Sequence, residues 1–132
     1  MTHASLKKYQ QARKTAGQQA SPYQLVAMLF QKLLDNIATA KGAIVQNNFA
    51  KKGSEISNAI AIIAVLEGSL DFKQGGEVSN NLASLYRYCS EQLLIASANN
   101  DVSKLDQIIQ TLLPIKAGWD AIPLENQNQV SF

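Results

Sequence analysis

The strongest constraint on the fold is a helical spacing of apolar residues that extends from about residue 22 to about residue 122. Polar or glycine-containing breaks interrupt it at Asn47-Asn48, at residues 71–76 and at residues 99–101. Apolar residues three or four positions apart share one face of a helix, whereas strands alternate at every second residue. The sequence therefore predicts an all-α fold, in which four helices with short connections pack as an antiparallel four-helix bundle.

Local signals mark where these helices begin and end. Ser21 can cap the first helix, Pro22 suits its first turn, and Gln24 can complete a capping box. Asn47-Asn48 predicts a turn, the pair Gly75-Gly76 predicts a loop, and Asp101 can cap the last helix. Because proline removes an amide donor and crowds the carbonyl of Gln110, Pro114 predicts a kink or break.

The first helix has a wide apolar stripe, which indicates contact with more than one neighbour. The other three helices each have apolar side chains at core spacing. The main positions are Leu25, Met28, Leu29, Leu33 and Ile37 in the first helix; Ile56, Ala59, Ile60, Ile63, Leu66 and Leu70 in the second; Val78, Leu82, Leu85, Tyr86, Cys89, Leu93 and Ala96 in the third; and Val102, Leu105, Ile108, Ile109, Leu112, Ile115, Trp119 and Ile122 in the fourth.

The chain divides into three parts: an N-terminal arm of residues 1–20, the helical bundle of residues 21–124, and a polar tail of residues 125–132. The arm is polar and Gln-rich, so we expect it to be mobile, or helical where it docks on the bundle. It lacks the apolar core of a signal peptide, and residues 59–66 are too short a run to cross a bilayer. We therefore expect a cytoplasmic protein without membrane insertion.

Several kinds of chemistry lack the residues that they need. The single histidine, His3, lies in the arm, so a catalytic triad, a metal-binding Glu-x-x-His motif and a phosphotransfer histidine in mid-helix are all missing. Cys89 lies at core spacing and is read as a small buried hydrophobe. The net charge is only +2, without a basic stripe for nucleic acid. We expect no catalytic activity, no cofactor and no metal.

The second helix has more apolar positions than one buried face requires. Ile62, Val65 and Ala61 lie outside its main stripe, and they either close onto the core or the arm or border a groove for a partner segment. An uncovered apolar patch of several hundred Å² would itself indicate binding.

Seven segments between about residues 9 and 122 form a combined pattern through their order and spacing: Tyr9-Gln10-Gln11, Ala20-Ser21-Pro22, residues 25–30, residues 68–78, residues 81–88, Asn99-Asn100-Asp101 and the run from Leu105 to Trp119. Together they resemble the FliS family, the flagellar secretion chaperones that bind flagellin. The chain departs from the family pattern at Phe30, where tyrosine is commoner, and at Pro114, where the family continues a regular helix.

The resemblance implies that the chain binds the disordered C-terminal segment of flagellin, prevents its premature polymerisation and keeps it competent for type III export. It also implies that Tyr9 of the arm covers part of the binding groove until flagellin displaces it. Other export components are further expected partners, and the chain is expected to be a monomer or a weak dimer. The residues expected to form the groove are Ile56, Ile60, Ile63, Leu66, Leu33, Leu34 and Tyr86.

Three other functions are weighed against this one. A general helical adaptor would bind a folded partner rather than a tail peptide. A phosphotransfer bundle is disfavoured by the position of His3. A structural protein that forms oligomers would be recognised by light scattering on the free chain.

Overall fold

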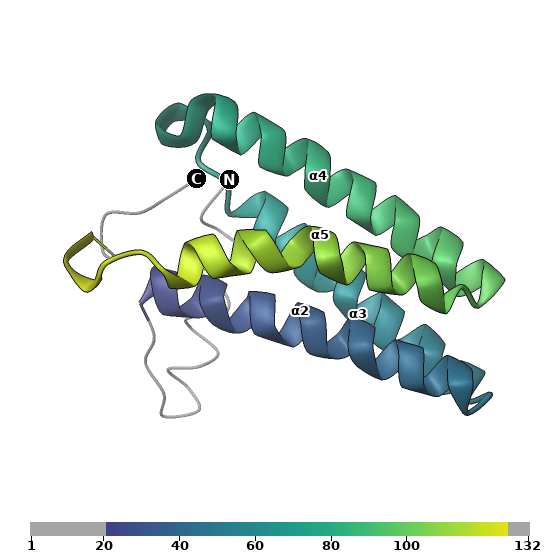
Figure 1. Ribbon diagram of the computed structural model, residues 1–132. Helices are drawn as coiled ribbons and strands as arrows, with labels where there is room; N and C mark the ends of the chain where they lie inside the picture. Colours follow the sequence, from purple (N-terminus) through teal and green to yellow (C-terminus); the bar gives the residue numbers. More distant parts are fainter. Residues whose placement is uncertain (1–20, 127–132) are drawn as a thin grey trace.

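The computed structural model describes residues 21–126, so the arm (residues 1–20) and residues 127–132 of the tail lie outside the described residues. Four α-helices and one short 3₁₀-helix make up this part of the chain (Figure 1). They are α2 (Pro22–Val45), α3 (Phe49–Gly68), α4 (Phe72–Asn99), α5 (Val102–Asp120) and η1 (Leu124–Asn126).

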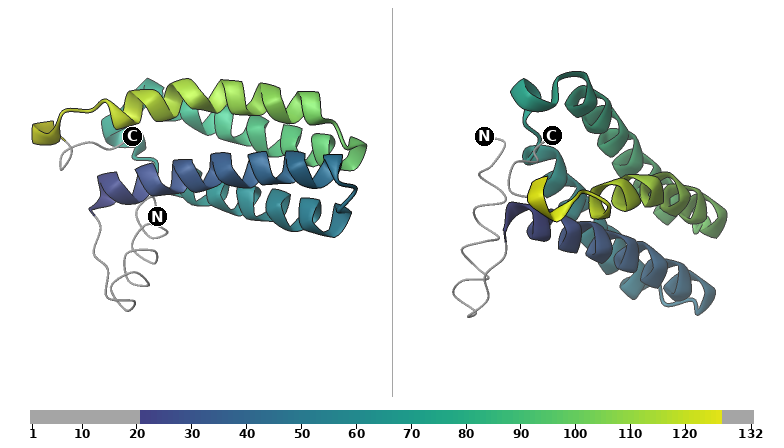
Figure 2. Two further views of the ribbon diagram at one scale, coloured as in Figure 1. Left: turned by 60° about the horizontal axis from the view of Figure 1, so that its bottom comes forward. Right: turned by 60° about the vertical axis from the view of Figure 1, so that its left-hand side comes forward.

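The helices form a ring in which each one packs against two others. α2 contacts α3 and α5, α4 also contacts α3 and α5, and the diagonal pairs do not approach closely. α2 and α4 run in one direction and α3 and α5 in the other, as both views of Figure 2 show. The all-α antiparallel bundle is confirmed. No helix in residues 21–126 is long and apolar enough to cross a membrane.

Polar caps begin all four helices. The predicted capping box is present, since Ser21 Oγ accepts from the Gln24 amide and Gln24 Oε1 accepts from the Ser21 amide, both at 3.1 Å. Asp101 caps α5, as predicted, and Asn48 of the predicted turn caps α3. Asp71 caps α4 by accepting from two amides, a role the sequence reading missed. Such caps satisfy amides that have no partner inside the helix.

The predicted loop around Gly75-Gly76 is largely absent. Residues 72–75 already form a helical turn behind the Asp71 cap, and only Gly76 departs from helical geometry, with φ of 50° and ψ of −121°. This conformation suits a residue without Cβ, so a single glycine bends the chain where a loop was expected. Ser79, which is buried, donates from Oγ to the Asp71 carbonyl at 3.0 Å and holds the turn against the main helix.

Of the predicted kink or break at Pro114, the break is wrong, because α5 continues to Asp120. Pro114 and Gln110 are both exposed. Because the Gln110 carbonyl lies on the solvent side, water can replace the hydrogen bond that proline cannot donate. Proline therefore costs stability here without ending the helix.

We expect Pro114→Ala to raise the free energy of unfolding by about 1–3 kcal/mol, because alanine restores the amide donor and removes the ring clash. Chemical denaturation monitored by circular dichroism measures the change. Gly118→Ala is the matched control, since a Cβ there meets nothing within 4 Å and should add only about 1 kcal/mol. A Pro114→Ala protein no more stable than the parent would contradict this account.

Candidate binding site

The structure places six of the seven predicted groove residues in the core. Each of them is less than a tenth exposed, and only Ile60 of α3 is partly exposed. The buried six are Leu33 and Leu34 of α2, Ile56, Ile63 and Leu66 of α3, and Tyr86 of α4. Tyr9, the predicted cover, lies outside the described residues. Among the seven residues, Ile60 is therefore the one that a partner can reach without separating the helices.

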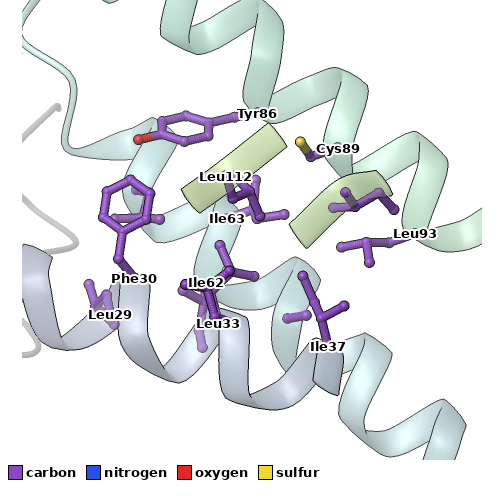
Figure 3. Close-up of a cluster of buried hydrophobic side chains, with 14 of the residues drawn as sticks. Leu29, Phe30, Leu33, Ile37, Ile62, Ile63, Tyr86, Cys89, Leu93 and Leu112 are labelled. Atoms are coloured by element: carbon purple, nitrogen blue, oxygen red, sulfur yellow. The ribbon is translucent and has the colours of Figure 1, made fainter. Parts of the chain in front are cut away.

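Figure 3 shows three of the six, Leu33, Ile63 and Tyr86, in the cluster of buried side chains. Phe30 of α2 and Tyr86 of α4 face each other across the diagonal, with ring centroids 6.4 Å apart and planes tilted by 49°. Leu33 and Ile63 belong to the same buried cluster. Aromatic pairs in this geometry add to the stabilisation that comes from burial. These side chains hold the ring together.

Two ionisable groups in this core are held neutral by burial. Burial raises the pKa of the Cys89 thiol to about 11. Burial, and next the charge of a Cys89 thiolate, raise the pKa of Tyr86 above its usual range. At pH 7 neither group is deprotonated, so Cys89 supplies no thiolate nucleophile.

The three apolar residues of α3 that lie outside its main stripe differ in how far they are buried. Ile62 is buried in the core, Val65 is partly buried against it, and Ala61 is exposed. The closing of Ile62 and Val65 onto the core is therefore confirmed. Among the described residues, no group of three or more His, Cys, Asp or Glu side chains could hold a metal ion.

Ile60 lies at the junction of α3 and α4, which we call the α3–α4 seam. Two contacts fix the alignment of this seam: Arg87 Nε donates to Glu67 Oε2 at 3.0 Å, and Lys52 Nζ donates to the Ser97 carbonyl at 2.8 Å. Ile60 precedes Glu67 by seven residues in α3. Leu94 follows Arg87 by seven residues in α4, which runs antiparallel to α3. Both therefore lie on the seam, about two turns from the ion pair.

Leu94 is 59% exposed and was not among the predicted groove residues. Phe49, at the start of α3, is 46% exposed and has Lys52 Nζ 5.2 Å from its ring centroid. Ile60, Leu94 and Phe49 give the α3–α4 seam an exposed apolar surface, and Arg87 and Lys52 add cationic groups. The sequence could not identify Leu94, because its spacing places it away from the buried face of α4.

A profile of the family described as "Flagellar protein FliS" matches residues 5–126. The chain belongs to the FliS family. Similar proteins include the flagellar secretion chaperone FliSB of Pseudomonas aeruginosa, 40% identical over 89% of this chain and 94% of that protein. The flagellar secretion chaperone FliS of Salmonella typhimurium is 34% identical, over 92% and 91%, and that of Vibrio cholerae is 35% identical, over 83% and 80%.

FliS family membership confirms the resemblance on which the functional reading depends. It makes the chain a flagellar secretion chaperone of a non-enzymatic family, and so confirms the prediction that the protein is not an enzyme. The matched range includes the whole described bundle, from Ser21 to Asn126. The family assignment therefore applies to the same residues that form the bundle.

The buried thiol predicts how stability depends on pH. A raised pKa means that the folded state keeps its proton while the unfolded state loses it, so stability is full below pH 9 and falls as pH rises toward 11. We expect a loss of about 2–3 kcal/mol over this range, measured by urea denaturation at several pH values.

Cys89→Ala is the control for this prediction. In that variant the decline should begin only near pH 10, the ordinary pKa of tyrosine, because Tyr86 is then the buried acid that remains. Identical pH profiles for the parent and the variant would rule out the thiol as the cause.

Proposed function

We propose that this protein binds the disordered C-terminal segment of flagellin in the cytosol, delays its polymerisation and keeps it competent for flagellar type III export. Family membership supports the class of client, and the exposed apolar surface of the α3–α4 seam supports the mode of binding. The observation that carries the proposal is that Ile60, alone among the seven predicted groove residues, combines core packing with exposed surface.

The physical argument begins with the way filaments grow. Subunits in a filament meet through heterologous contacts that do not close, so free subunits add without limit. An apolar terminal segment that is disordered before assembly can instead fold onto a prepared helical surface. Coupled folding of this type buries on the order of 1,000–3,000 Å² and costs about 2–5 kcal/mol in ordering. The large area gives affinity, and the ordering cost keeps release accessible.

The seam provides the features that such a client segment needs. Ile60 and Leu94 offer apolar contact at matching heights on α3 and α4, and Phe49 extends the surface along α3. An amphipathic helical segment has apolar side chains three or four residues apart. When it lies along α3 and α4, these side chains can contact the apolar residues of the seam. The Glu67–Arg87 pair at one end and Lys52 at the other provide polar partners for the rim.

The six buried groove candidates stay predictions as client contacts. A client reaches Leu33, Ile56 or Tyr86 only where neighbouring helices separate, because these side chains are fully covered in the closed bundle. In our proposal these buried residues hold α3 and α4 in place beside the seam. Tyr9, in the arm, covers the groove until flagellin displaces it.

We expect Leu94→Glu to weaken the binding of a flagellin C-terminal peptide at least about tenfold, because a charge replaces an apolar contact. Isothermal titration with the purified chain measures this affinity. Ile60→Glu should have a similar effect on the other side of the seam. The free energy of unfolding of Leu94→Glu should change by less than about 0.5 kcal/mol, since the side chain is exposed.

Leu113→Glu is the matched control, because Leu113 is a comparably exposed leucine on α5, away from the seam. If the peptide binds the parent and both leucine variants equally, the seam is not the binding surface. If the parent binds no tail peptide and binds only folded flagellin, the protein acts as an adaptor instead.

Deletion of residues 1–18 tests the role of the arm. We expect the bundle to stay folded, because its core is built from residues 23–119, and we expect the peptide to associate faster. Stopped-flow mixing gives the association rate, and thermal melting followed by circular dichroism checks the fold. Tyr9→Ala in the full chain should reproduce the faster association. An unchanged rate in both proteins would remove Tyr9 as a cover.

A further inference from the structure

The outward side of α4 has a row of exposed side chains that its two neighbouring helices do not cover. Among the described helices, α3 and α5 are the ones whose backbones lie close to α4, and the contact of Tyr86 with α2 is on the inner side of α4 (Figures 1 and 2). We call this row the α4 stripe. Its members are Glu77, Asn81, Ser84, Tyr88, Glu91 and Ile95, all of them exposed.

The spacing of the α4 stripe alternates between four and three residues. Residues at this spacing lie in one row along a face of the helix, and in this row two of the six members, Tyr88 and Ile95, are large and apolar. The row begins immediately after the bend at Gly76 and extends over about 27 Å of regular helix. A surface with this repeat can accept a second helix along its length.

The α4 stripe is both acidic and apolar. Tyr88 is 53% exposed and Ile95 is 44% exposed, while Glu77 and Glu91 lie about 21 Å apart on the same face. Neither glutamate has an ion-pair partner within residues 21–126. The α4 stripe therefore presents negative charge that no described cation neutralises.

Nearby cations on the flanks have other partners. Toward α3, Arg87 is bound to Glu67. Toward α5, Lys104 Nζ donates to Gln92 Oε1 at 2.7 Å. Lys73 precedes Glu77 by four residues, but the bend at Gly76 lies between them and interrupts the helical alignment. The charge of the α4 stripe remains available to a partner.

We propose that the α4 stripe is a docking surface for a basic amphipathic helix of a partner protein, separate from the flagellin segment. Apolar residues of that helix cover Tyr88 and Ile95, and lysine or arginine residues on its flanks meet Glu77 and Glu91. Opposite charges at this spacing set the register and direction of the helix and accelerate its association.

This surface differs from the α3–α4 seam. Leu94 precedes Ile95 by one residue, so it points about 100° away from Ile95 around the helix axis, whereas Glu91 lies between the two surfaces, within one turn of Leu94 and of Arg87. An anionic lipid surface is disfavoured as an occupant, because it would repel both glutamates. Two partners can therefore occupy α4 at the same time.

The test uses the full chain and a designed peptide of about three heptads, with leucine at a and d and lysine at e and g. The matched probe has glutamate in place of every lysine. Titration at low salt is followed by amide chemical shifts of the protein. We expect the lysine peptide to bind, with shifts along residues 77–95, and the glutamate peptide not to bind.

Glu77→Lys/Glu91→Lys should weaken binding of the lysine peptide at least about tenfold, since two attractions become repulsions. Glu55→Lys/Glu125→Lys has the same net charge and should bind as the parent does. Glu77→Lys alone, which lies far from Arg87 and Leu94, and Glu55→Lys/Glu125→Lys should bind the flagellin peptide as the parent does, which keeps this test separate from the proposed function. Shifts elsewhere, equal binding by both double variants, or light scattering that shows self-association through α4 would overturn the proposal.

Discussion

Four helices joined in sequence close into a ring only if the first and last contact each other, and here Tyr23 and Trp119 make that contact. Short turns connect α2 to α3, α3 to α4 and α4 to α5, but α5 returns to α2 without a local connection. The Tyr23 and Trp119 rings stack with centroids 5.4 Å apart. Trp119 Nε1 donates to the Tyr23 carbonyl, and the Tyr23 hydroxyl donates to the Trp119 carbonyl, both at 3.1 Å. Two residues 96 positions apart thus satisfy each other's polar groups inside an apolar contact.

The two diagonal helices, α2 and α4, differ in how much of their length is buried. Twelve of the 24 residues of α2 are buried, but only six of the 28 residues of α4 are. The burial of α2 even includes Asn36, whose Nδ2 has no hydrogen-bond partner among the described residues and costs stability. α4 instead keeps Leu94, Tyr88 and Ile95 exposed. α2 therefore contributes most of the buried surface, and α4 leaves more apolar surface exposed.

Helix number, order and most of the ends were predictable because they depend on local signals. Ser21 to Gln24 form a cap within four residues, and Asn47 takes the positive φ that a turn requires. Gly76 and Pro114 were misjudged because their effect depends on the surroundings. An acidic cap at Asp71 lets the helix start before the glycine, and solvent at Gln110 lets it continue past the proline. The Tyr23–Trp119 contact left no local signal, since it joins opposite ends of the bundle.

The binding surface was harder to predict than the fold for a physical reason. A helical repeat of apolar residues shows which face is covered, but the same repeat fits a core and a groove equally well. Ile56, Ile60 and Ile63 share one stripe of α3, yet Ile56 and Ile63 face the centre and Ile60 lies at its flank. What distinguishes them is the position of α4, which the Glu67–Arg87 pair fixes across the seam. A residue at the edge of a stripe can pack against the core and still contact a partner, whereas a residue at the centre of the stripe is completely buried by the core. For a helical chaperone, the candidates for client contact are therefore the flanking positions, and only the packing partner of each helix identifies them.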